Sequence, residues 1–215
     1  YRFHFNAHNM VVYGKKDGIY LISDPVMETV TSLTEKELEK VRFAKGAFAP
    51  KGHIYYPTSF PEQLQLEKAI IKGIKHTCRD MLAPVPVVGV KGIRKIAKLI
   101  RKWPKAKGIK IANHYLGQIV RMQEEIGTGG GGFRYIYAAF LQEAGKLLTN
   151  SQLLELSNEM TLIGDQWRDF AVEASRIYKN RSNTVAVDQY DHVATLLEDI
   201  ANKEEVFFKK LKKAI

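Results

Sequence analysis

The alternation of apolar and polar residues changes character near residue 58. Before that point, residues 8–13 and 18–24 are rich in β-branched and aromatic side chains, and they flank the charged segment GKKD, a pattern typical of a β-hairpin. A capping box that begins at Thr34 predicts a helix ending at Gly46. Residues 54–56 are expected to add one short strand.

Beyond residue 58, apolar residues recur at helical spacing almost to the end of the chain. We expect this pattern to be interrupted by Pro84 and Pro86, by Pro104 and by a run of glycines at 127–132. The sequence therefore predicts an α+β protein, with a strand-rich part at 1–58 and an α-helical bundle at 59–215.

The composition is globular, with 45% hydrophobic and 26% charged residues. No apolar run approaches the roughly 18 residues that a membrane span requires, so we expect no membrane insertion. A single cysteine excludes an internal disulfide framework and favours a reducing, cytoplasmic compartment. No metal site is expected, because five of the six histidines have no partner at a spacing typical of metal ligands: His4, His53, His76, His114 and His192.

The net charge of +10 is concentrated in the middle of the chain, where residues 59–126 hold 14 basic and 5 acidic residues. Six basic residues between 91 and 102 follow helical spacing and predict one basic face: Lys91, Arg94, Lys95, Lys98, Arg101 and Lys102. A solvated face is one interpretation, and docking of an acidic protein is another. Nucleic acid is the least favoured partner, because only Trp103 is interleaved with the basic residues.

The two strands of the hairpin carry a histidine and an aspartate at their open end. A turn centred on Lys16 sets three pairs of residues opposite one another: Tyr13 and Ile19, Met10 and Ile22, and His8 and Asp24. An aspartate that accepts from one imidazole nitrogen leaves the other nitrogen free to act as a base. The pair is therefore a candidate catalytic dyad, or else an ordinary hydrogen bond at the surface of the hairpin.

The glycine run precedes a helix, where free backbone N–H groups bind anions. Gly129, Gly130 and Gly131, with Arg134 one turn into the helix, are therefore candidate residues for binding a phosphate or an oxyanion. The alternative is a tightly packed turn between helices, in which only glycine tolerates positive φ.

The stretches FNAHNMVVYGKKDGIYLISDP and VRFAKGAFAPKGHIYY resemble the amino-terminal domain of the butirosin biosynthesis protein H family, which is similar to papain-like cysteine enzymes. The stretches GTGGGGFRYIYAAFLQEAG and IGDQWRDFA resemble the helical domain that follows it in the same family. The resemblance implies a partial papain-like domain at 1–58 and catalytic roles for His8 and Asp24.

The family's nucleophile is a cysteine upstream of the histidine strand, and no such cysteine is in this sequence. Cys78 follows the dyad and lies on an apolar stripe, so we interpret it as a core residue. We therefore expect that an amino-terminal segment, or a separate chain, carrying the nucleophile is missing, or that the protein is an inactive relative.

The resemblance implies transfer of an acyl group from an acyl carrier protein to a small-molecule amine, aminoglycoside-like in the family. The donor is linked through phosphopantetheine, no separate cofactor is expected, and the basic helix at 91–102 is a candidate docking surface for the carrier protein. The alternatives are a thiol amidase or peptidase, and a binding module without catalytic activity.

Overall fold

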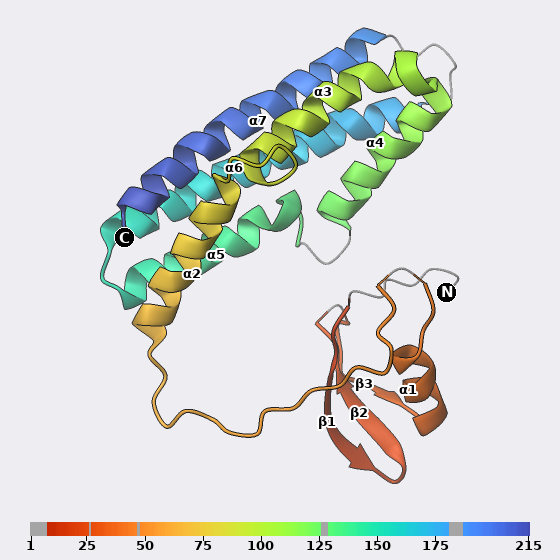
Figure 1. Cartoon of the computed structure of the whole chain (residues 1–215), viewed down its shortest axis with the longest axis vertical. Helices are drawn as coiled ribbons and strands as arrows, with labels where there is room; N and C mark the ends of the chain where they lie inside the picture. The colour runs from red at the N-terminus through yellow and green to blue at the C-terminus, as the bar shows by residue number, and fades with distance from the viewer. Residues whose placement is uncertain (1–7, 26, 47, 126–128, 181–186) are drawn as a thin grey trace. The chain divides into compact units, whose positions relative to one another are not determined.

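The structure is a computed structural model that describes residues 8–25, 27–46, 48–125, 129–180 and 187–215. The chain divides into two compact units, Tyr1–Gln63 and Leu64–Ile215 (Figure 1). The first contains strands and one helix and the second contains helices, so the α+β class expected from the sequence is confirmed.

The first unit is a three-stranded antiparallel sheet followed by a helix. The strands lie in the order β1 (Val11–Lys16), β2 (Ile19–Ser23) and β3 (Thr31–Leu33), and α1 spans Glu35–Arg42. Strand β3 was not expected from the sequence, because three residues carry too little alternation to be recognised.

The hairpin is present, but its predicted register is wrong. The turn consists of Asp17 and Gly18, whose positive φ angles of 50° and 81° suit a two-residue hairpin turn. Ile22 pairs with Val12 instead of Met10, and Ile19 pairs with Lys16 instead of Tyr13. The irregularity between Val12 and Gly14 reduces the difference from the predicted register from three residues beside the turn to two residues beyond it.

The capping box of α1 forms as expected: the backbone N–H of Glu37 donates to Thr34 Oγ1, and the N–H of Thr34 donates to Glu37 Oε2. The helix ends at Arg42, one turn before the glycine expected to end it. Residues 54–56 do not form the expected strand; they have no regular secondary structure and their side chains are exposed.

The second unit contains six α-helices in its described residues. Their bounds are α2 (Leu66–Met81), α3 (Gly89–Lys107), α4 (Ile109–Glu124), α5 (Arg134–Leu147), α6 (Ser151–Lys179) and α7 (Val187–Lys213). A single 3-10 turn, η1 (Gly131–Phe133), leads directly into α5. None of the helices described here combines the length and the apolar character needed to cross a membrane.

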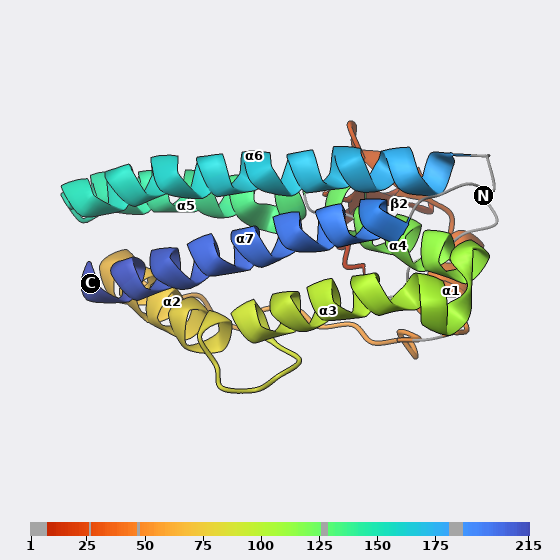
Figure 2. The ribbon, with the colours of Figure 1, turned by 90° about the horizontal axis from the view of Figure 1, so that it is seen from above.

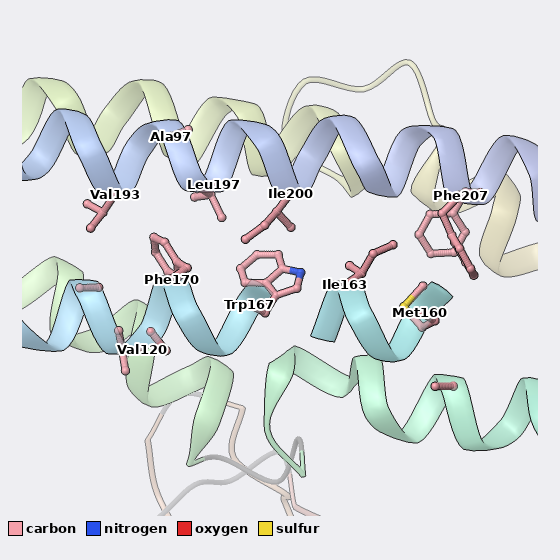
Figure 3. Packing of buried hydrophobic residues seen from close by; sticks show 14 of the residues in the cluster. Ala97, Val120, Met160, Ile163, Trp167, Phe170, Val193, Leu197, Ile200 and Phe207 are labelled. Atoms are coloured by element: carbon pink, nitrogen blue, oxygen red, sulfur yellow. The ribbon is translucent and has the colours of Figure 1, made fainter. Parts of the chain in front are cut away.

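The two long helices, α6 and α7, run side by side along the length of the helical unit (Figures 1 and 2). The shorter helices α5 and α4 pack along α6, and α2 and α3 pack along α7. Side chains from the facing sides of the two long helices interdigitate, with Trp167 and Phe170 of α6 opposite Leu197 and Ile200 of α7 (Figure 3). The bundle expected from the sequence is therefore present.

The expected interruptions between helices also form, with one exception. Pro84 and Pro86 lie between α2 and α3, and the glycine run lies between α4 and α5. Helix α3, however, continues through Pro104 to Lys107. Because Pro104 lies in the last turn, it removes one backbone hydrogen bond without displacing a long following segment.

Candidate functional site

The imidazole of His8 and the carboxylate of Asp24 form a hydrogen bond of 2.7 Å between Nε2 and Oδ1. Both side chains are partly buried, with exposed fractions of 30% for His8 and 16% for Asp24. A carboxylate can only accept, so Nε2 carries the proton of this bond and Nδ1 of the neutral ring holds the lone pair. In this geometry the carboxylate of Asp24 fixes the orientation of the His8 ring and leaves Nδ1 available to accept a proton.

The contact forms by a different route from the one the sequence suggested. His8 lies before β1 and Asp24 directly follows β2. The observed pairing of Val11 with Ser23, continued outward, sets Asp24 opposite Met10. The bond to His8 is therefore diagonal, a separation that a histidine and an aspartate side chain can bridge together.

Cys78 lies in α2, in the helical unit, and is 1% exposed. Burial raises the pKa of its thiol to about 11, an effect that the charge of Lys212 only partly opposes. A thiol with this pKa is protonated at neutral pH and is a poor nucleophile. Cys78 is placed as a core residue.

Among the described residues, no group of three or more His, Cys, Asp or Glu side chains is arranged to hold a metal ion. His76 is bonded to Asp80, four residues later on the same exposed helix face. His4 lies outside the described residues.

The glycine run has an unusual backbone. Gly129, Gly130, Gly131 and Gly132 all have φ between 54° and 83°, and Phe133 continues the left-handed conformation at 70°. The backbone N–H of Gly131 donates to Glu124 Oε1 at 3.1 Å. One of the N–H groups predicted to bind an external anion therefore already contacts a carboxylate of α4. Gly127 and Thr128 lie outside the described residues.

Close packing accounts for glycine at position 131. A Cβ there would lie 3.1 Å from the ring of Tyr135 and 3.3 Å from the carbonyl oxygen of Gly164. These contacts favour the packed turn between helices, the alternative considered from the sequence. Binding of an anion by Gly129 and Gly130 stays a prediction.

Arg134 is part of a polar cluster within the bundle. Its Nε and Nη2 donate to Oε1 and Oε2 of Glu204 at 2.8 and 2.9 Å, and its Nη1 donates to the carbonyl of Gly132. The guanidinium also lies 4.7 Å from the ring centre of Trp167. Arg134 therefore joins the glycine run to α7.

Glu204 is the centre of this cluster and was not recognised from the sequence. Its side chain is fully buried, and Trp167 Nε1 donates to Oε1 at 2.7 Å. The signal was available, because Glu204 lies four residues after Ile200 and four before Phe208 on the apolar stripe of α7. An acid at such a position requires a buried partner.

An open groove of about 610 Å³ lies beside the glycine run, between α4 and α6. Its floor includes Val120 and Ala171, and Glu124 and Arg168 border it. Because Glu124 also accepts from Gly131, the groove and the glycine run share a side chain.

The basic face predicted on residues 91–102 divides in the structure. Arg94 donates to Glu205 and Arg101 donates to Glu198, so both arginines face α7. The hydrogen bond from Arg101 lowers the pKa of Glu198. The four lysines of the predicted set are exposed: Lys91, Lys95, Lys98 and Lys102.

The fold and these sites define an α+β protein whose larger part is a helical bundle. A family model described as "Domain of unknown function (DUF4872)" matches residues 36–211, so the chain belongs to this family. The matched range includes the Arg134–Glu204 cluster and begins after His8 and Asp24. Searches of curated proteins and of solved structures found no significant match.

Proposed function

We propose that the protein takes part in thiol-dependent acyl transfer, with His8 as the general base and Asp24 as the residue that orients it. The hydrogen bond of 2.7 Å between His8 Nε2 and Asp24 Oδ1 is the observation that carries this proposal. It leaves Nδ1 as the basic atom of the ring, as thiol activation requires. The papain-like relationship of the small unit belongs to the same proposal.

In the first step, His8 Nδ1 takes the proton of a cysteine thiol, and the thiolate attacks the carbonyl carbon of a carrier-bound thioester. The new carbon–sulfur bond forms as the bond to the pantetheine sulfur breaks, and the imidazolium returns its proton to that sulfur. In the second step an amine attacks the carbonyl carbon of the acyl-enzyme and His8 accepts the amine proton. The carbon–sulfur bond to the cysteine then breaks, and the imidazolium returns that proton to the cysteine sulfur, which restores the thiol and the neutral His8. Asp24 stabilises the imidazolium in both steps.

The cysteine in this scheme is not among the 215 residues, because the single thiol, Cys78, is buried in the other unit. We place it on a polypeptide segment that completes the site around His8. The donor is an acyl carrier protein bearing phosphopantetheine, and the acceptor is a small-molecule amine.

The test is intact-protein mass spectrometry of the protein together with the proposed cysteine-bearing segment, after incubation with acyl-pantetheine thioesters. We expect an acyl adduct that releases an amide when an amine is added. The adduct should be lost in His8→Ala and strongly reduced in Asp24→Asn, since general base catalysis contributes about 10²–10⁴-fold.

Cys78→Ser is the matched control and should retain the adduct, because this thiol lies in the core of the bundle. An adduct that persists in His8→Ala, or that disappears in Cys78→Ser, would contradict the proposal. Release of free acid in place of amide would identify a hydrolase.

A further inference from the structure

Helix α3 carries a row of exposed lysines along its outer side. Lys91, Lys95, Lys98, Lys102 and Lys105 are spaced alternately by four and three residues, and all are exposed. The buried residues of the same helix, Val90, Ala97, Ile100 and Pro104, face the bundle. We call the five exposed lysines, from Lys91 to Lys105, the lysine row.

The lysine row is a cost to the stability of the helix. Neighbouring members lie three or four residues apart, where like charges repel one another. Lys91 also lies in the first turn, where the helix dipole disfavours a positive charge, and that turn contains no acidic residue. A face selected only for solubility normally mixes both signs of charge.

The chain itself provides little to neutralise this row. No acidic residue occurs between Asp80 and Glu124, so neither α3 nor the first turns of α4 supply one. Glu205 and Glu198 of α7 accept hydrogen bonds from arginines of α3, namely Arg94 and Arg101. Within the lysine row, the charge of Lys98 also helps to lower the pKa of Glu198, and Asp191 lies near Lys102 and Lys105. The two arginines of α3 therefore form the hydrogen bonds to α7, whereas the lysines of the row stay exposed.

The surface at both ends of the lysine row has features of a protein interface. At one end, Lys102 and Lys105 border an open pocket of about 490 Å³ together with Asp191 of α7. At the other, the loop before α3 exposes Val85, Val87 and Val88. Apolar contacts beside a charged surface are typical of protein partners.

We propose that the lysine row is a docking surface for a protein that presents an exposed acidic helix. From Lys91 to Lys105 the row extends about 21 Å, which is the length of roughly four helical turns. Single-stranded nucleic acid is disfavoured because it needs aromatic platforms, whereas Trp103 is half-buried and packs edge-on against Tyr115 at 5.3 Å. This inference deepens the function proposed above. The docking surface is argued independently of that function, and only the partner's role as acyl donor rests on it.

The test uses the full chain and an apo-acyl carrier protein, an acidic helical protein without its pantetheine arm, as the probe. Binding is measured by calorimetry at low and at physiological salt. We expect Lys95→Glu/Lys102→Glu to weaken binding at least about tenfold, because two attractive contacts become repulsive. Lys146→Glu/Lys203→Glu, which makes the same change of charge on α5 and α7, should leave binding unchanged.

Thermal unfolding of the same variants separates docking from folding. Each new glutamate lies three or four residues from a remaining lysine, so Lys95→Glu/Lys102→Glu should unfold at the same temperature as the wild type or higher. Wild-type affinity in this variant would overturn the proposal. Binding of duplex DNA or of phosphatidylserine vesicles in place of the carrier protein, lost in the same variant, would also overturn it.

His8→Ala keeps the two proposals distinguishable. This variant should bind the apo carrier protein like the wild type, since docking involves no proton transfer. Lost acyl transfer with retained docking contradicts neither proposal, whereas retained acyl transfer in His8→Ala contradicts the chemistry alone.

Discussion

Trp167 and Glu204 meet inside the bundle, where the indole Nε1 of α6 donates to the carboxylate of α7 at 2.7 Å. Arg134 of α5 donates two further hydrogen bonds to the same carboxylate. Three helices are therefore connected through one fully buried side chain. Both oxygens of Glu204 accept hydrogen bonds from residues of the bundle, which offsets the cost of burying its carboxyl group.

Replacing Glu204 should destabilise the protein strongly. Glu204→Ala leaves the Arg134 guanidinium and the Trp167 N–H without their acceptor, and we expect the free energy of unfolding to fall by about 2–4 kcal/mol. Denaturant unfolding followed by tryptophan fluorescence measures this loss. Glu159→Ala removes an exposed partner of Lys210 and should cost at most about 0.5 kcal/mol. Equal effects of the two substitutions would show that the buried cluster has no special importance.

Alanine should have opposite effects at two glycines of the helical unit. Gly131→Ala places a Cβ on a residue with positive φ and brings that atom close to the ring of Tyr135. We expect this substitution to lower the free energy of unfolding by about 2 kcal/mol. Gly73→Ala lies within α2 and meets nothing within 4 Å, so it should raise stability by about 0.5–1 kcal/mol. Chemical denaturation of both variants checks the signs. A stabilised Gly131→Ala would mean that the turn is not packed as described.

Cys78 should resist alkylation in the folded protein. Its pKa of about 11 keeps the thiol protonated at pH 8, and burial blocks the reagent. Iodoacetamide at pH 8 should modify the protein only after unfolding, which mass spectrometry detects.

The same thiol makes stability depend on pH. The folded state holds the thiol proton up to about pH 11, whereas the unfolded chain releases it near pH 9.0. The contribution of this thiol to stability is therefore present below pH 9 and lost as the pH rises toward 11. Rapid labelling of the native protein would contradict its placement.

Asp24 should determine which nitrogen of His8 carries the proton. In the wild type we expect the Nε2–H tautomer of the neutral ring, because Nε2 donates to Asp24. Long-range ¹H–¹⁵N correlation spectra at high pH identify the tautomer, and Asp24→Ala should remove the preference. Asp80→Ala is the matched control: it should change the signals of its partner His76 and leave those of His8 unaltered. An unchanged His8 spectrum in Asp24→Ala would refute the orienting role.

The large features of the fold were predictable because they repeat along the chain. Helical spacing of apolar residues persists through α6 and α7, so the bundle was foreseen. The hairpin register was not, although Asp17–Gly18 is a strong signal for a two-residue turn. The irregularity after Val12 left no trace in the pattern of apolar residues.

The candidate sites were predictable to different degrees. The contact between His8 and Asp24 was predicted correctly although the register was wrong, because the two ends of a short hairpin lie close together in several registers. The separate roles of the arginines and lysines of α3 depend on where the acids of α7 lie, which only the packed bundle determines. Glu204 was overlooked because its partners, Arg134 and Trp167, are distant in sequence.

The left-handed backbone of the glycine run also bears on how this protein can evolve. Every other amino acid that replaces a glycine carries a Cβ, and at Gly130 or Gly131 the positive φ would strain any such residue. We therefore expect every amino-acid substitution at these two glycines to be unfavourable. In a library of all single substitutions, this short turn should tolerate fewer changes than the surfaces of the helices it joins.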